Sequence, residues 1–161
     1  MEWIGRLVRH RERQAVEDGD YLPGEWPGLR SPCTVGGLAE LEARLGIPLE
    51  SEYRDFLLIS DGMEDFSWDG MSVLGAVDWP DSPKVARAID FRDMIVGGRI
   101  DRDLGIPEGV RMAPIGINRD GDAAILLLGG ASNWSPRYLW TGSGDSVFFD
   151  RLSEVFEWAC E

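Results

Sequence analysis

The sequence is poor in the side chains on which most metal sites and many enzymes depend, with one histidine and two cysteines among 161 residues. Cys33 and Cys160 lie far apart in a chain large enough to bury a core without cross-links, so we expect reduced thiols rather than a disulfide. Two cysteines and one histidine also lack the paired spacing that is typical of zinc sites. We therefore expect neither a metal nor a cofactor.

Basic residues are scarce relative to acidic ones: sixteen Lys and Arg stand against twenty-nine Asp and Glu, for a formal net charge of −13. Such a field repels phosphate backbones and anionic membrane surfaces, which argues against nucleic acid and membranes as partners. No apolar run approaches the roughly 20 residues that span a bilayer, and the arginine-dense N-terminus lacks the apolar region of a secretory signal. We expect a cytoplasmic protein that attracts cationic partners.

The sequence offers little support for catalysis. His10 lies between Arg9 and Arg11 on a charged helical face, which is typical of a solvated histidine. The chain contains no Gly-x-Ser-x-Gly elbow. Paired loop carboxylates such as Glu64 and Asp120 could form a carboxylate-based hydrolase, but such neighbours arise readily among twenty-nine acids. We therefore assign no catalytic residue and keep the hydrolase as a less favoured alternative.

Apolar spacing predicts five helices and five strands along the chain, with most of the strands after residue 110. The predicted helices cover residues 2–17, 35–45, 49–60, 84–95 and 150–160. The predicted strands cover residues 72–77, 111–118, 123–128, 138–141 and 146–149. Asp120-Gly121 favours a hairpin between two of these strands, and glycines and prolines between residues 19 and 32 predict an irregular connection. In the first helix the arginines are expected mostly opposite the apolar face.

Leucine, glycine and aromatic residues recur in a fixed order between residues 45 and 62. The series comprises Leu45-Gly46, Leu49, Tyr53, Phe56-Leu57 and Gly62. It resembles the Leu-Gly-x-x-Leu-Pro-x-x-Tyr-x-x-Phe-Leu core of the SUKH superfamily, of Smi/Knr type, and residues 112–158 are similar to the second half of that family. Two positions depart from the pattern: Glu50 stands where proline is usual, and Asp61 stands where asparagine is common.

The resemblance implies an α+β fold in which helices pack on a mainly antiparallel sheet. We expect this domain at residues 34–161, preceded by an N-terminal helix and a Pro/Gly-rich connection at residues 1–33. Many bacterial members of the superfamily are immunity proteins, whereas fungal members are regulatory adaptors. The resemblance thus implies a non-enzymatic binding protein that neutralises a toxin, with an intracellular adaptor as the alternative. The net charge of −13 adds the expectation that the toxin has a basic surface.

The candidate partner-binding segment runs from Asp61 to Asp81, because it contains six acidic and three large aromatic residues without one basic residue. Aromatic anchors surrounded by charge are common in protein interfaces. The candidate residues are Asp61, Glu64, Asp65, Phe66, Trp68, Asp69, Asp78, Trp79 and Asp81. Trp68 and Trp79 could equally well cover the core while the acids face water.

Overall fold

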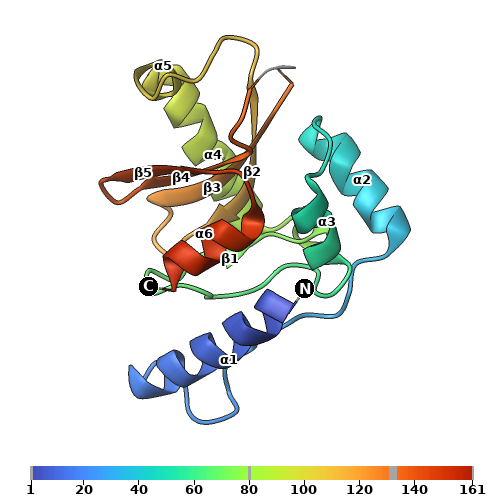
Figure 1. Ribbon diagram of the computed structural model, residues 1–161, viewed down its shortest axis with the longest axis vertical. Coiled ribbons are helices and arrows are strands. Elements are labelled where there is room, and N and C mark those ends of the chain that lie inside the picture. Colours follow the sequence, from blue (N-terminus) through green and yellow to red (C-terminus); the bar gives the residue numbers. More distant parts are fainter. Residues whose placement is uncertain (1, 80, 131–133, 161) are drawn as a thin grey trace.

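The computed structural model describes residues 2–79, 81–130 and 134–160, and within them five strands form one antiparallel sheet whose strand order follows the chain (Figure 1). The strands are β1 Ser72–Val73, β2 Arg111–Ile117, β3 Ala123–Gly129, β4 Tyr138–Gly142 and β5 Asp145–Phe149. The helices are α1 Glu2–Glu17, α2 Val35–Leu45, α3 Ser51–Leu57, α4 Pro83–Gly97, α5 Ile100–Asp103 and α6 Leu152–Ala159, and a 3-10 turn, η1, spans Ala76–Asp78. The expected α+β class is confirmed.

Both faces of the sheet are covered, which is why β3 is apolar at nearly every position. Ala123, Ile125 and Leu127 belong to the core on the side of α1, α2, α3 and α6. The alternate residues Ala124 and Leu126 belong to a second core against α4. Because successive side chains of a strand point to opposite faces, a strand buried on both sides has no polar alternation.

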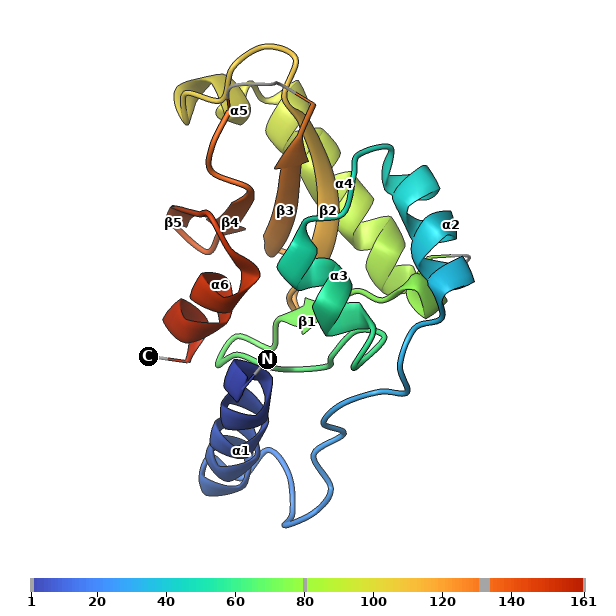
Figure 2. The same ribbon diagram turned by 45° about the vertical axis from the view of Figure 1, so that its right-hand side comes forward.

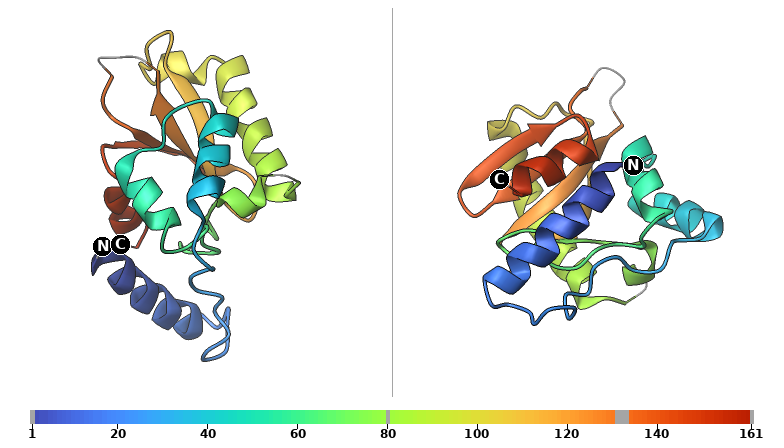
Figure 3. Two further views of the ribbon diagram at one scale, coloured as in Figure 1. Left: turned by 90° about the vertical axis from the view of Figure 1, so that its right-hand side faces the viewer. Right: turned by 60° about the horizontal axis from the view of Figure 1, so that its bottom comes forward.

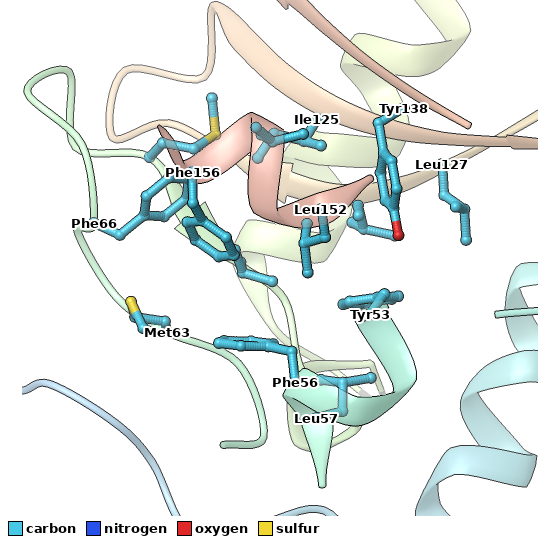
Figure 4. Close-up of a cluster of buried hydrophobic side chains, with 14 of the residues drawn as sticks. Tyr53, Phe56, Leu57, Met63, Phe66, Ile125, Leu127, Tyr138, Leu152 and Phe156 are labelled. Carbon is cyan, nitrogen blue, oxygen red and sulfur yellow. The ribbon is translucent and has the colours of Figure 1, made fainter. Parts of the chain in front are cut away.

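Helix α3 supplies the centre of the larger core (Figure 4). Tyr53 and Phe56 are fully buried, as the helical spacing predicts. The ring of Phe56 lies 5.6 Å from that of Phe156 in α6 and 6.4 Å from that of Trp3 in α1, centroid to centroid. The family-like residues at these positions are therefore structural.

The N-terminal helix packs beside α6 (Figure 3). Its boundaries agree with the prediction, and Arg6, Arg9 and Arg13 are exposed as expected, whereas Arg11 is buried with only 1% of its surface exposed. The Arg11 Nε donates a hydrogen bond to the carbonyl oxygen of Asp65 at 2.9 Å. A guanidinium bonded to a buried backbone acceptor can thus occupy a helix face that periodicity alone assigns to apolar residues.

Three local features differ from the expected elements. Helix α3 ends at Leu57 rather than near residue 60, and the predicted strand at residues 72–77 is shortened to two residues followed by η1. The four-residue helix α5 was not predicted. No helix within the described ranges is long and apolar enough to cross a membrane.

Candidate partner-binding surface

Residues 63–73 form a narrow loop that reaches toward α6 and then returns to end in β1 (Figure 2). Met63 and Val73 exchange backbone hydrogen bonds of 2.9 and 2.8 Å, and the Phe66 amide donates to the Met71 carbonyl at 2.8 Å. Gly70 has a φ of +73°, a conformation that side-chain-bearing residues rarely adopt. We call residues 66–71 the Trp68 loop.

Trp68 lies on this loop with 67% of its surface exposed, so it is not a core residue. The neighbouring Phe66 is fully buried, and its ring lies 4.5 Å from that of Phe156. The expectation that Phe66 could face a partner is therefore wrong, because its side chain anchors the loop in the core. Trp68 is held between two buried flanks, Phe66 and Met71.

Trp79 is half-buried and contacts both hydrophobic cores, so most of its ring serves the fold. Its indole Nε1 is buried and donates no hydrogen bond within the described ranges. Asp81, two residues later, is exposed. The ends of the candidate segment thus differ in accessibility.

The acidic residues of the segment are largely compensated by cations from elsewhere in the chain, which corrects the expectation of uncompensated charge. Glu64 forms ion pairs with both Arg30 and Lys84. Asp78 also pairs with Arg30, with 2.7 Å between the Arg30 Nη1 and the Asp78 Oδ2. These cations lie at positions whose proximity no local sequence pattern indicates.

The carboxylates of Asp61 and Asp78 also accept hydrogen bonds from backbone amides. Asp61 accepts hydrogen bonds from the Ala76 amide at 2.5 Å and the Val77 amide at 3.2 Å, one on each carboxylate oxygen. An asparagine offers a single side-chain oxygen, so aspartate suits this position better than the residue common in the family. Asp78 accepts a 2.8 Å hydrogen bond from the Gly75 amide, and together the two carboxylates fix η1.

Asp65 fastens the N-terminal arm, which we define as residues 2–31, to the domain. Its carboxylate accepts hydrogen bonds from the Tyr21 hydroxyl at 2.9 Å and from Arg119 at 2.7 Å. Burial and the hydrogen bond to Asp65 raise the pKa of Tyr21. Asp65 is itself buried and has a φ of +54°, a conformation that aspartate tolerates better than most residues. Its carboxylate is therefore already paired within the protein and is not a free acid for a basic partner.

A cavity of about 340 Å³ lies between α1 and α6 and is lined by His10, Ser153 and Cys160, among others. These are residue types that nucleophilic catalysis uses, but no hydrogen bond in the described part of the chain joins any two of them. Burial raises the pKa of Cys160, which disfavours the reactive thiolate. His10 is nonetheless half-buried against α6 rather than fully solvated, contrary to expectation.

Comparison with known proteins gives one result that bears on these features. Residues 32–157 match the SMI1 / KNR4 family (SUKH-1), whereas no curated protein matches the chain. Proteins with this domain are commonly immunity proteins, and the domain is generally non-enzymatic. The match covers most of the chain, begins beyond the N-terminal arm and includes the buried α3 residues; the chain therefore belongs to the SMI1 / KNR4 (SUKH-1) family.

Proposed function

We propose that the protein is a cytoplasmic immunity protein that binds a cognate polymorphic toxin and neutralises it by covering its surface, without catalysis. Family membership supports a role in protein binding. No hydrogen bond in the described part of the chain joins any two of His10, Ser153 and Cys160, and the pKa of Cys160 is raised. Both observations favour binding over a nucleophilic reaction.

The observation that carries the proposal is the exposure of Trp68 on a loop whose flanks are buried. A large aromatic side chain buries much apolar area on binding, and such residues often dominate the affinity of an interface. Because Phe66 and Met71 fix the loop, little backbone freedom is lost when Trp68 meets a partner. Trp68 therefore has the properties of a preorganised anchor.

Of the nine candidate residues, the proposal retains Trp68 and Asp81 as the contact residues. Asp69 accepts a hydrogen bond from the Ser67 hydroxyl within the loop, Trp79 packs against both cores, and the others serve the loop, η1 or the N-terminal arm. The net charge of −13 favours a toxin with a basic surface, because long-range attraction raises the rate of encounter.

The test begins with the genes that neighbour this one. The product of an adjacent toxin gene is purified, and its binding to the wild-type protein, to Trp68→Ala and to Met94→Ala is measured by surface plasmon resonance. Met94, on α4, is the matched control because its side chain is also large, apolar and about half exposed. We expect Trp68→Ala to weaken binding by about 2 kcal/mol or more, mainly through faster dissociation, with an unchanged melting temperature.

Three results would count against the proposal. A wild-type protein that neither binds the adjacent toxin nor restores growth of cells producing it is not its immunity protein, and an adaptor role gains weight. Equal affinities of wild type and Trp68→Ala place the interface elsewhere. A large drop in melting temperature for Trp68→Ala assigns Trp68 to the core.

A further inference from the structure

A second cavity, of about 240 Å³, lies directly beside the Trp68 loop. Its walls combine Asp65 and Gly70 from the 63–73 loop, the start of α4, and the turn between β2 and β3, while Tyr21 contributes from the N-terminal arm. Pockets that enclose drug-sized ligands measure about 300–1,000 Å³. This smaller cavity suits one functional group, such as a single side chain of a bound protein.

The cavity carries positive charge in an acidic protein. Three cations, Lys84, Arg87 and Arg119, line it with two acids, Glu64 and Asp65, which leaves one positive charge in excess. We call this site the cation cleft. Lys84 is the only lysine in the sequence.

The excess charge can be assigned to one side chain. Glu64 pairs with Lys84, and Asp65 pairs with Arg119. Arg87 pairs with no carboxylate in the described part of the chain, and its Nη1 donates instead to the carbonyl oxygen of Arg119 at 2.9 Å. A guanidinium has five N–H donors, so Arg87 retains donors for an incoming acceptor.

Helix α4 adds to the positive potential. Lys84 and Arg87 lie in its first two turns, at the positive end of the helix dipole. Burial and the guanidinium groups of Arg30 and Arg87 lower the pKa of Lys84 to about 8, while the contacting Glu64 carboxylate acts in the opposite direction. An added anion would also favour the charged ammonium.

We propose that the cation cleft receives one carboxylate side chain, an aspartate or a glutamate, of the protein that binds Trp68. This inference rests on the proposed function, because the cleft and Trp68 share one loop. One carboxylate neutralises the excess charge, whereas a phosphate dianion would leave the cleft negative. Guanidinium groups also bind carboxylates through paired hydrogen bonds, which fixes the orientation of the incoming group.

The cleft alone is tested with acetate as the probe. Protein labelled at the lysine ε-carbon with ¹³C gives one lysine side-chain NMR signal, because Lys84 is the only lysine. We expect a saturable shift of this signal with sodium acetate and no saturable shift with sodium chloride of equal ionic strength. Arg87→Gln should raise the acetate Kd about threefold or more. Arg92→Gln is the control, because Arg92 lies on the same helix and outside the cavity.

The carboxylate source is tested in the complex with the adjacent toxin. We expect Arg87→Gln to weaken toxin binding about tenfold and Arg92→Gln to leave it unchanged, with both variants retaining the wild-type melting temperature. The toxin's interface acids are then substituted one at a time. The acid that enters the cleft is the one whose substitution weakens binding to the wild-type protein but causes no additional loss of affinity for Arg87→Gln.

Each contrary result has a distinct meaning. An acetate shift that does not saturate, or that is the same in Arg87→Gln, overturns the cleft as a carboxylate site. Inorganic phosphate that binds tenfold more tightly than acetate identifies a phosphate site instead. Toxin binding by the wild type that is equal in Arg87→Gln overturns this inference and leaves the proposed function intact. Absence of wild-type toxin binding overturns both.

Discussion

Replacement of Glu50 by alanine should cost far more stability than its position at the start of a short helix suggests. Glu50 is the N-cap of α3, and its Oε2 accepts hydrogen bonds from the amides of Glu52 at 2.9 Å and Tyr53 at 3.3 Å. The same oxygen accepts a 2.5 Å hydrogen bond from the hydroxyl of Tyr138, a fully buried residue of β4. One carboxylate thus joins α3 to the sheet.

The magnitude follows from these contacts. Loss of an N-cap costs about 0.5–2 kcal/mol, and an orphaned buried hydroxyl costs about 1–3 kcal/mol. We therefore expect Glu50→Ala to lower the free energy of unfolding by about 3 kcal/mol. Tyr138→Phe removes the hydroxyl itself and should cost only about 1 kcal/mol. In the double variant no hydroxyl is left unpaired, so the loss should be smaller than the sum of the two single losses by about 1–2 kcal/mol.

Urea unfolding at pH 7, followed by tryptophan fluorescence, measures all four proteins of this cycle. Ser51→Ala is the control, because it removes a donor to the other Glu50 oxygen, Oε1, and leaves the Tyr138 contact intact. If the losses from Glu50→Ala and Tyr138→Phe add to within about 0.5 kcal/mol, the two side chains do not act together and the reasoning is refuted.

The remaining predictions concern acid stability, the core, the arm and catalysis. Burial alone would raise the pKa of Glu50, but the hydrogen bonds to its carboxylate outweigh burial and lower the pKa. The free energy of unfolding of wild type should therefore exceed that of Glu50→Gln by its full amount above about pH 5, and the difference should fade as the pH falls through the lowered pKa. Urea unfolding at a series of acidic pH values measures this difference. Phe56→Ala should lower the free energy of unfolding by about 3–5 kcal/mol in urea, and a loss below about 1 kcal/mol would contradict its central place in the core. Asp65→Asn, which tolerates the same backbone conformation, should weaken the attachment of the arm and increase limited proteolysis in residues 18–29, whereas unchanged cleavage would mean that the arm is held elsewhere. Joint substitution of His10 and Cys160 should leave toxin neutralisation intact in a growth assay, and a loss without unfolding would reopen the question of catalysis.

Periodic apolar residues made the longer helices predictable from the sequence, and local turn chemistry made the hairpin predictable. The spacing of Tyr53 and Phe56 fixes one face of α3, and both side chains are buried. The hairpin between β2 and β3 was predictable because its turn chemistry is local: the Asn118 Oδ1 accepts hydrogen bonds from the amides of Gly121 and Asp122 at 2.9 and 3.0 Å. Such features depend on residues a few positions apart.

Two kinds of feature could not be predicted: those that depend on distant residues, and an element too short for a periodic pattern. The burial of Arg11 requires the carbonyl oxygen of Asp65, which is 54 positions away. Helix α5 has only four residues and follows Arg99 with a φ of +60°, so it presents too few residues for a periodic signal. The presence of Glu50 where the family usually has proline is explained only by its hydrogen bond to Tyr138, which is 88 positions away.

The candidate site illustrates the same limit for charge. All charged residues in the segment 61–81 are acidic, yet Arg30, Lys84 and Arg119 form ion pairs with its carboxylates. Of its acids, Asp61 and Asp78 are engaged by backbone amides. Residue type along a segment therefore overestimates the negative charge that a partner would meet there.

This arrangement separates two electrostatic roles. The net charge of −13 acts over a distance and attracts any basic surface, so it raises encounter rates without distinguishing between partners. The cation cleft acts only at contact, where Arg87 would face the partner. A toxin with an acid at that position gains a paired contact, whereas a toxin with a lysine or arginine there meets like charge at close range. Discrimination would then come mainly from repulsion of the wrong partner, at a site whose sign is opposite to that of the protein as a whole.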